Sequence, residues 1–144
     1  MKQFPFACWI VACSFLLTLP FASGCGRGPD VARITGTVTH QGEPVGGIQV
    51  NFYPDEGRVS HGTTDAEGRY TLQYSPGVEG AEFGRHRVWI SYFPESLEEE
   101  MAIYEGRQQF DDQIAAILTK YGNVETTPLT VEVTGNETID LQLD

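Results

Sequence analysis

Thr63-Thr64-Asp65-Ala66-Glu67-Gly68-Arg69-Tyr70 is the stretch that decides the fold, because it has the form of a tight turn between two strands. The Asp65 carboxylate can accept hydrogen bonds from backbone N–H groups of its own turn. Gly68 can adopt the left-handed backbone conformation that closes a bulged hairpin. We therefore expect an antiparallel hairpin here, with Asp65 and Gly68 as structural turn residues.

Apolar and polar residues alternate with period two on both sides of this hairpin, which is typical of half-buried strands. The predicted strands cover residues 34–39, 48–53, 59–64, 70–74, 85–93, 129–133 and 139–143. Residues 75–82 are rich in Gly and Pro and are expected to form a loop. Seven short strands at regular spacing predict an all-β fold, a seven-stranded β-sandwich.

The period-two pattern stops at Pro94. Ser96-Leu97-Glu98-Glu99 has the form of a helix capping box. Apolar residues then recur at helical spacing in two stretches: Leu97, Met101 and Tyr104, followed by Phe110, Ile114, Ile117 and Leu118. We interpret residues 95–121 as a helical insertion folded across the sheet.

Residues 1–24 differ from the rest of the chain. Lys2 is the only charge before Arg27, an apolar stretch covers 4–21, and the small residues 22–24 follow. This order of a charged start, an apolar middle and a small-residue end predicts a cleaved signal peptide over 1–24. A membrane-spanning helix is the alternative, since about 18 apolar residues can cross a bilayer. Prolines at both ends of the apolar stretch disfavour it.

The sequence Ala22-Ser23-Gly24-Cys25 resembles the lipobox of bacterial lipoproteins. In that motif the cysteine thiol receives a diacylglycerol and becomes the new N-terminus, and Leu usually stands where Ala22 stands here. The resemblance implies lipidation of Cys25, including palmitate, and an acylated spacer over 25–32 before a domain at 33–144. Because Cys8 and Cys13 leave with the signal peptide, the mature chain is expected to have no internal disulfide.

The chain is acidic, with a formal net charge of −11. Without residues 1–24, which contain one lysine and no acid, 8 basic and 20 acidic residues remain and the charge is −12. Such a surface repels phosphate backbones and anionic lipid headgroups. The charge therefore argues against nucleic acid as a partner and implies that membrane attachment depends on the lipid.

The domain contains four sequence pieces in one order: Ile34–Val38, Glu43–Ile48, Thr63–Tyr70 and Gly84–Val88. Together they resemble the carboxypeptidase regulatory-like domain, a seven-stranded sandwich of transthyretin (prealbumin) type. The run from Lys120 to Val133 is similar to the tail of small envelope lipoproteins in that superfamily, which planctomycete bacteria encode in many copies. The resemblance covers residues 33–144 and implies the same sandwich here.

Two positions depart from the family pattern. His86 stands where an aromatic residue is usual, which predicts looser packing at that end of the strand. Leu118 and Thr119 precede Lys120 where Pro is frequent, which favours a helical segment. The family has no common catalytic residue to transfer, so the resemblance implies a domain without enzymatic activity.

No catalytic or metal-binding pattern is complete in this sequence. Its three histidines, His40, His61 and His86, lack the spacing of a zinc motif. The Asp65–Glu67 segment is too short for a calcium loop, and no GxSxG elbow occurs. The acidic residues of 98–112 indicate a solvated helix face instead of a glycosidase pair. We therefore expect no metal, no cofactor and no enzymatic activity.

Two functions fit these observations. The first is a structural or interaction module of the cell envelope, held by its lipid on the periplasmic or outer-membrane side, with a protein or polysaccharide partner. The alternative is a carbohydrate-binding lipoprotein that uses an aromatic face formed by Trp89, Phe93 and Tyr53. We expect the insertion to cover Trp89 with its apolar residues Leu97, Met101, Phe110 and Ile114, which favours the first function.

Overall fold

The computed structural model describes residues 28–144 except 95 and 108. The predicted signal peptide (1–24) and the lipidation site Cys25 lie outside these residues. Neither helix in the described part of the chain has the length and apolar character needed to cross a membrane. The fold is mostly β, with several antiparallel strand pairs and two short helices, so the all-β, sandwich-like prediction is confirmed at this level.

The larger sheet has six strands in the order β11-β10-β4-β5-β7-β8, all antiparallel to their neighbours. Their bounds are β4 (Ile48–Pro54), β5 (Ser60–Thr63), β7 (Gln73–Ser75), β8 (Val78–Glu79), β10 (Gly84–Tyr92) and β11 (Thr130–Val133). The pairing of β10 with β4 is the longest and runs without a break from His86↔Pro54 to Tyr92↔Ile48. This pair forms the centre of the sheet.

The second sheet is built around β2 (Ile34–His40). The short strands β3 (Glu43–Pro44) and β6 (Arg69–Thr71) pair with it in antiparallel fashion. The C-terminal strands β12 (Glu137–Thr138) and β13 (Leu141–Leu143) pair with it in parallel. A separate pair joins β1 (Val31–Ala32) to β9 (Ala81–Glu82), so regular structure begins two residues before the predicted boundary at 33.

The core lies between the two sheets. It contains the inward residues of β2, β4 and β10 and a contribution from the C-terminal strand: Ile34, Val38, Ile48, Val50, Phe52, Val88, Ile90, Leu141 and Leu143. His86 is also fully buried, its Nε2 lies 2.8 Å from the Glu82 carbonyl oxygen, and its ring packs at 5.8 Å from that of Phe52. The imidazole therefore occupies the place of an aromatic ring in the core, and within the described residues its buried Nδ1 has no hydrogen-bond partner.

The predicted strand 70–74 is divided at Leu72. Residues before Leu72 form β6 and pair with β2, whereas residues after it form β7 and pair with β5 in the other sheet. Leu72 itself is fully buried, and its N–H donates to the Ile34 carbonyl oxygen at 3.0 Å. The chain therefore crosses from one layer to the other within a single alternating segment.

The turn between β5 and β6 contains Asp65 and Gly68. The predicted antiparallel hairpin is wrong, because β5 pairs with β4 and β7 in one sheet and β6 pairs with β2 in the other. Asp65 Oδ1 accepts hydrogen bonds from the N–H groups of Glu67 at 3.0 Å and Arg69 at 2.8 Å. These bonds, led by the one from the Arg69 backbone, lower the pKa of Asp65 below its ordinary value of 3.8. Gly68 has a φ of +75°, in the left-handed region that favours glycine.

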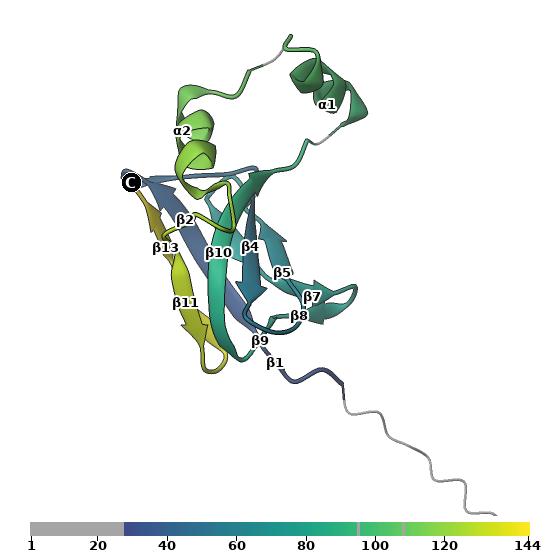
Figure 1. Cartoon of the computed structure of the whole chain (residues 1–144), viewed down its shortest axis with the longest axis vertical. Helices are drawn as coiled ribbons and strands as arrows, with labels where there is room; N and C mark the ends of the chain where they lie inside the picture. The colour runs from purple at the N-terminus through teal and green to yellow at the C-terminus, as the bar shows by residue number, and fades with distance from the viewer. Residues whose placement is uncertain (1–27, 95, 108) are drawn as a thin grey trace, which may run out of the picture.

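The insertion between β10 and β11 contains α1 (Leu97–Tyr104) and α2 (Asp112–Tyr121). Each has a side-chain cap at its N-terminus: Ser96 Oγ accepts from the Glu99 N–H at 3.1 Å, and Asp111 Oδ1 from the Ile114 N–H at 2.7 Å. Both helices lie at one end of the molecule, and residues 28–30 leave from the opposite end (Figure 1).

Candidate ligand face

The outer surface of the six-stranded sheet carries the candidate aromatic residues. Along β10, Val88 and Ile90 are buried in the core, so Trp89 points to the other side. Along β4, Val50 and Phe52 are buried in the same core, so Tyr53 shares the outer side with Trp89.

The strand register aligns four of these outward residues in one line across the sheet. Trp89 on β10 pairs with Asn51 on β4, Asn51 pairs with His61 on β5, and His61 pairs with Gln73 on β7. We call Trp89, Asn51, His61 and Gln73 the outer row. In this row the Trp89 indole and the polar side chains of His61 and Gln73 can meet a ligand, whereas Asn51 is buried between them.

Asn51 holds the centre of the outer row in place. Its side chain is 4% exposed, and its Nδ2 donates to Ser91 Oγ at 3.0 Å and to the Trp89 carbonyl oxygen at 3.4 Å. The Ser91 hydroxyl in turn donates to Gln49 Oε1 at 3.3 Å. These hydrogen bonds join β4 to β10 on the outer side of the sheet. They therefore restrain the backbone of β10 at Trp89.

Tyr53 and Phe93 occupy different surroundings from Trp89. Tyr53 is 40% exposed, and the Arg87 guanidinium lies 5.3 Å from the centre of its ring, a cation–π distance. Tyr53 is a diagonal neighbour of Trp89, because the partner of Trp89 is two residues earlier on β4. Phe93 follows the end of β10 and is 71% exposed. The fold therefore brings Tyr53 and Trp89 together and leaves Phe93 beyond the sheet.

The insertion does not cover this face in the predicted way. Trp89 is half-buried, whereas Leu97, Met101 and Phe110 are exposed. Ile114, the fourth residue of the predicted cover, packs into the core between the sheets. The predicted cover by these four residues is wrong, because α2 uses its apolar side to close one end of the core and Leu97 and Met101 remain exposed. Phe110 packs against Tyr92 of β10, with 5.1 Å between the ring centroids.

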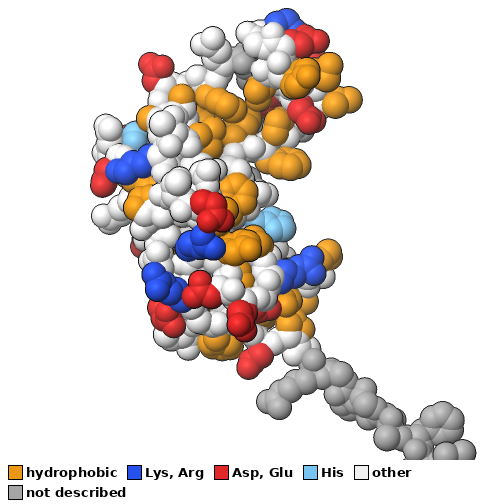
Figure 2. Space-filling view, viewed as in Figure 1, with side chains coloured by type: hydrophobic (Ala, Val, Ile, Leu, Met, Phe, Trp, Pro, Cys, Tyr) orange, Lys and Arg blue, Asp and Glu red, His pale blue; other side chains and the backbone are white. Residues whose placement is uncertain are grey.

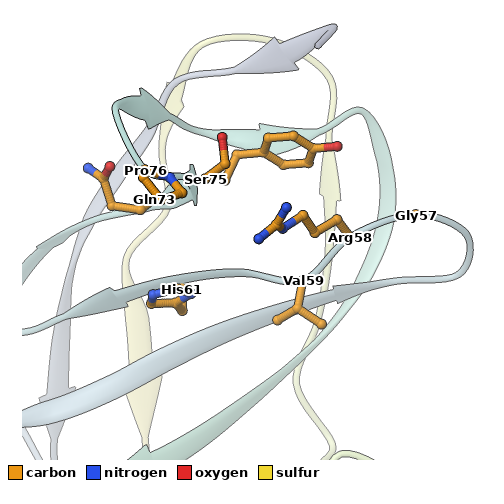
Figure 3. Close-up of a pocket in the computed structure, with 8 residues that line it drawn as sticks. Gly57, Arg58, Val59, His61, Gln73, Ser75 and Pro76 are labelled. Carbon is orange, nitrogen blue, oxygen red and sulfur yellow. The ribbon is translucent and has the colours of Figure 1, made fainter.

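A groove of about 820 Å³ continues the outer row at His61 and Gln73. Arg58 and His61 lie on one side of it, and Gln73 and Ser75 on the other (Figure 3). Tyr74 contributes an aromatic wall, with the Arg58 guanidinium 5.9 Å from the centre of its ring. The groove therefore adds further hydrogen-bond donors beside an aromatic surface.

Tyr74 also has an acidic partner at this groove. Its hydroxyl donates to Glu82 Oε1 at 2.7 Å. This hydrogen bond is the main reason why the pKa of Tyr74 is raised above its ordinary value of 10.0. The hydroxyl hydrogen of Tyr74 is therefore engaged by Glu82, and Tyr74 contributes its ring to the groove.

Sequence reasoning did not identify the polar members of this face. The sequence pattern suggested only a metal-ligand role for His61, and it gave no functional role to Asn51, Gln73 or Arg58. The strand alternation that predicted the outer position of Tyr53 also places Asn51 on that side. The line to His61 and Gln73 depends on strand order and register, which alternation does not reveal. Within residues 28–144, apart from 95 and 108, no group of three His, Cys, Asp or Glu side chains is arranged to hold a metal ion.

Comparisons with known proteins give little further information. No protein family and no curated protein matches the chain. A solved structure of a DUF3823 family protein from Parabacteroides merdae is similar to it, with a TM-score of 0.43 and 13% sequence identity. The match covers 79% of this chain and 46% of that structure, so the chain spans about half the length of the protein it resembles.

Proposed function

We propose that this chain is a non-enzymatic lipoprotein of the bacterial cell envelope, whose outer row and neighbouring groove bind a glycan. In this proposal the domain is a carboxypeptidase regulatory-like sandwich of transthyretin type. The lipobox-like residues 22–25 support the lipid anchor on Cys25. The acidic surface supports attachment through acyl chains instead of charge.

One observation carries the glycan part of the proposal: the register that aligns Trp89, Asn51, His61 and Gln73 across four neighbouring strands. A pyranose ring offers an apolar face that stacks on indole and a rim of hydroxyl groups that exchange hydrogen bonds with imidazole and amide groups. The partly exposed Trp89 ring supplies the first contact, and His61 and Gln73 supply the second. The groove beside Tyr74 extends the surface for a further sugar unit.

A structural or interaction module without a sugar site is the competing function, and it predicts that the insertion covers Trp89. Leu97, Met101 and Phe110 are exposed, so they do not form the predicted cover over Trp89. Binding through the outer face of the sheet is therefore the function that the geometry supports better.

Tryptophan emission tests this proposal directly. Trp9 lies within residues 1–24, so Trp89 is the only tryptophan once they are removed. We expect soluble starch, xylan or peptidoglycan fragments to shift its emission. In affinity electrophoresis through the same glycan, Trp89→Ala and His61→Ala/Gln73→Ala should each weaken retardation by about tenfold, roughly 1.4 kcal/mol.

Phe83→Ala is the matched control, because Phe83 is an exposed aromatic residue that precedes β10 and lies outside the outer row. It should migrate like the unsubstituted protein. Emission that no glycan changes, together with equal retardation of all variants, would reject the glycan-binding face.

A further inference from the structure

Helix α1 presents an apolar stripe to solvent. Leu97, Met101 and Tyr104 are spaced at i, i+4 and i+7, which places them on one side of the helix. Their side chains are 73%, 45% and 87% exposed. Ala102, by contrast, is buried, and Glu99 accepts a hydrogen bond from the Tyr92 hydroxyl of β10. The helix therefore turns its apolar stripe away from the sandwich.

This stripe is unusual for a surface helix, whose apolar side normally packs on the protein. Single exposed apolar residues are common, but a contiguous apolar surface rimmed by polar groups marks an interaction site. Hydrophobic side chains are visible over α1 with acidic side chains beside them (Figure 2). Phe93, four residues before Leu97, adds another exposed apolar side chain at the base of the insertion.

The charge around the stripe restricts what can cover it. Residues 93–112 contain seven carboxylates and one arginine, a formal charge of −6 out of −11 for the whole chain. The single arginine, Arg107, is already paired with Glu105. A second copy would bring the same −6 segment against it, and anionic lipid would also be repelled. A partner with a basic, partly apolar surface would be attracted by the carboxylates around the stripe and would contact the apolar side chains at its centre.

We propose that the stripe of Leu97, Met101 and Tyr104 is the docking site of a partner protein with a basic, apolar contact surface. Apolar side chains of the partner cover the stripe, and its Lys or Arg side chains meet Glu98 and Glu100 at the rim. This site lies on the insertion, so it is separate from the outer row and does not depend on glycan binding.

The probe for this test is a synthetic amphipathic peptide of leucine and lysine, titrated by calorimetry into the detergent-solubilised full chain. We expect salt-sensitive binding that Leu97→Ser/Met101→Ser/Tyr104→Ser weakens by at least about tenfold. That triple variant keeps every carboxylate, so the affinity that it loses measures the apolar contact alone. Because the three side chains are exposed, the variant should melt like the unsubstituted protein.

Two further variants make the test specific. Glu98→Gln/Glu100→Gln should weaken binding and reduce its salt dependence, because both carboxylates belong to the proposed rim. Phe83→Ser removes an exposed aromatic residue outside the insertion and should leave binding unchanged.

Three outcomes would overturn the proposal. Equal binding by the triple variant would mean that the peptide responds only to overall negative charge. Self-association of the unsubstituted chain in sedimentation, lost in the triple variant, would assign the stripe to a second copy. In vesicles of phosphatidylcholine, blue-shifted emission from a dye on Leu97→Cys, without peptide, would assign the stripe to lipid.

Discussion

Gly68 and Gly77 have nearly the same φ angle in different surroundings. Their φ angles are +75° and +78°. A Cβ atom on Gly68 would lie 2.6 Å from the Val38 carbonyl oxygen, whereas nothing lies within 4 Å of a Cβ on Gly77. Substitutions at the two positions can therefore be compared. Gly77 reports the intrinsic strain of the left-handed conformation, and Gly68 reports that strain together with the clash with a neighbouring strand.

We predict that Gly77→Ala lowers the free energy of unfolding by about 1 kcal/mol, the cost of placing an L-residue in the left-handed region. Gly68→Ala should cost more than about 2 kcal/mol, because the turn must also move away from β2. Urea denaturation of the two variants measures the difference. Equal losses would mean that the turn relaxes freely and that the contact with Val38 adds no strain.

The two helices of the insertion have opposite relations to the core. Ile117 of α2 is fully buried, and Ile114 and Tyr121 join it in the core. The Tyr121 hydroxyl accepts a hydrogen bond from the Asp144 N–H at 3.1 Å, which ties α2 to the end of the C-terminal strand. Helix α2 therefore closes the sandwich at the end where β13 finishes, whereas the Leu97 side of α1 contributes nothing to the core.

This difference predicts unequal costs for two similar truncations. Ile117→Ala should destabilise the protein by about 2–5 kcal/mol, because it leaves a cavity in a packed core. Leu97→Ala should change stability by no more than about 0.5 kcal/mol. Chemical denaturation of both variants tests the assignment, and a large loss for Leu97→Ala would show that α1 packs against the protein in solution.

Local pattern predicted the elements well where alternation was long. Strands β2, β4 and β10 lie within a residue of their predicted bounds, since period two identifies a half-buried strand directly. The two-residue strands β8 and β9 fall in the predicted loop 75–82, because two residues carry no periodicity. Alternation also continues through Leu72 while the hydrogen-bonding partner changes, so it cannot report the switch between sheets.

The docking direction of the insertion could not be predicted from spacing. Leu97, Met101 and Tyr104 have the same helical pattern as a buried stripe, but burial also requires a surface within reach. The core end is occupied by Ile114 and Ile117 of α2 instead. The same limit applies to the candidate ligand face. Residue types and alternation predicted its aromatic side chains, but the outer row became visible only from the register between strands.

At the scale of the whole molecule, the helical insertion and the N-terminal end of the domain are separated along the long axis. The helices lie at one end, and residues 28–30 leave from the other (Figure 1). Cys25 precedes Gly28 by three residues, which can span at most about 10–11 Å when extended. An acyl anchor on Cys25 would therefore hold the β1 end of the domain close to the membrane and present the insertion away from it.

The last prediction concerns that anchor. Export of the chain should yield a mature protein that begins at Cys25, incorporates labelled palmitate and sediments with membranes. Two or three acyl chains give stable attachment where one chain gives only reversible binding, and the charge of −12 on the mature chain offers no electrostatic substitute.

Cys25→Ser should abolish palmitate incorporation and cleavage before residue 25, whereas Cys13→Ser, within residues 1–24, should keep both. Mass spectrometry of the intact protein and membrane fractionation provide the measurements. Membrane recovery of both the unsubstituted chain and Cys25→Ser with residues 1–24 still attached would instead identify the apolar stretch 4–21 as a spanning anchor. In that case the domain would still emerge from its β1 end, so the insertion would remain the membrane-distal surface while the lipid assignment failed.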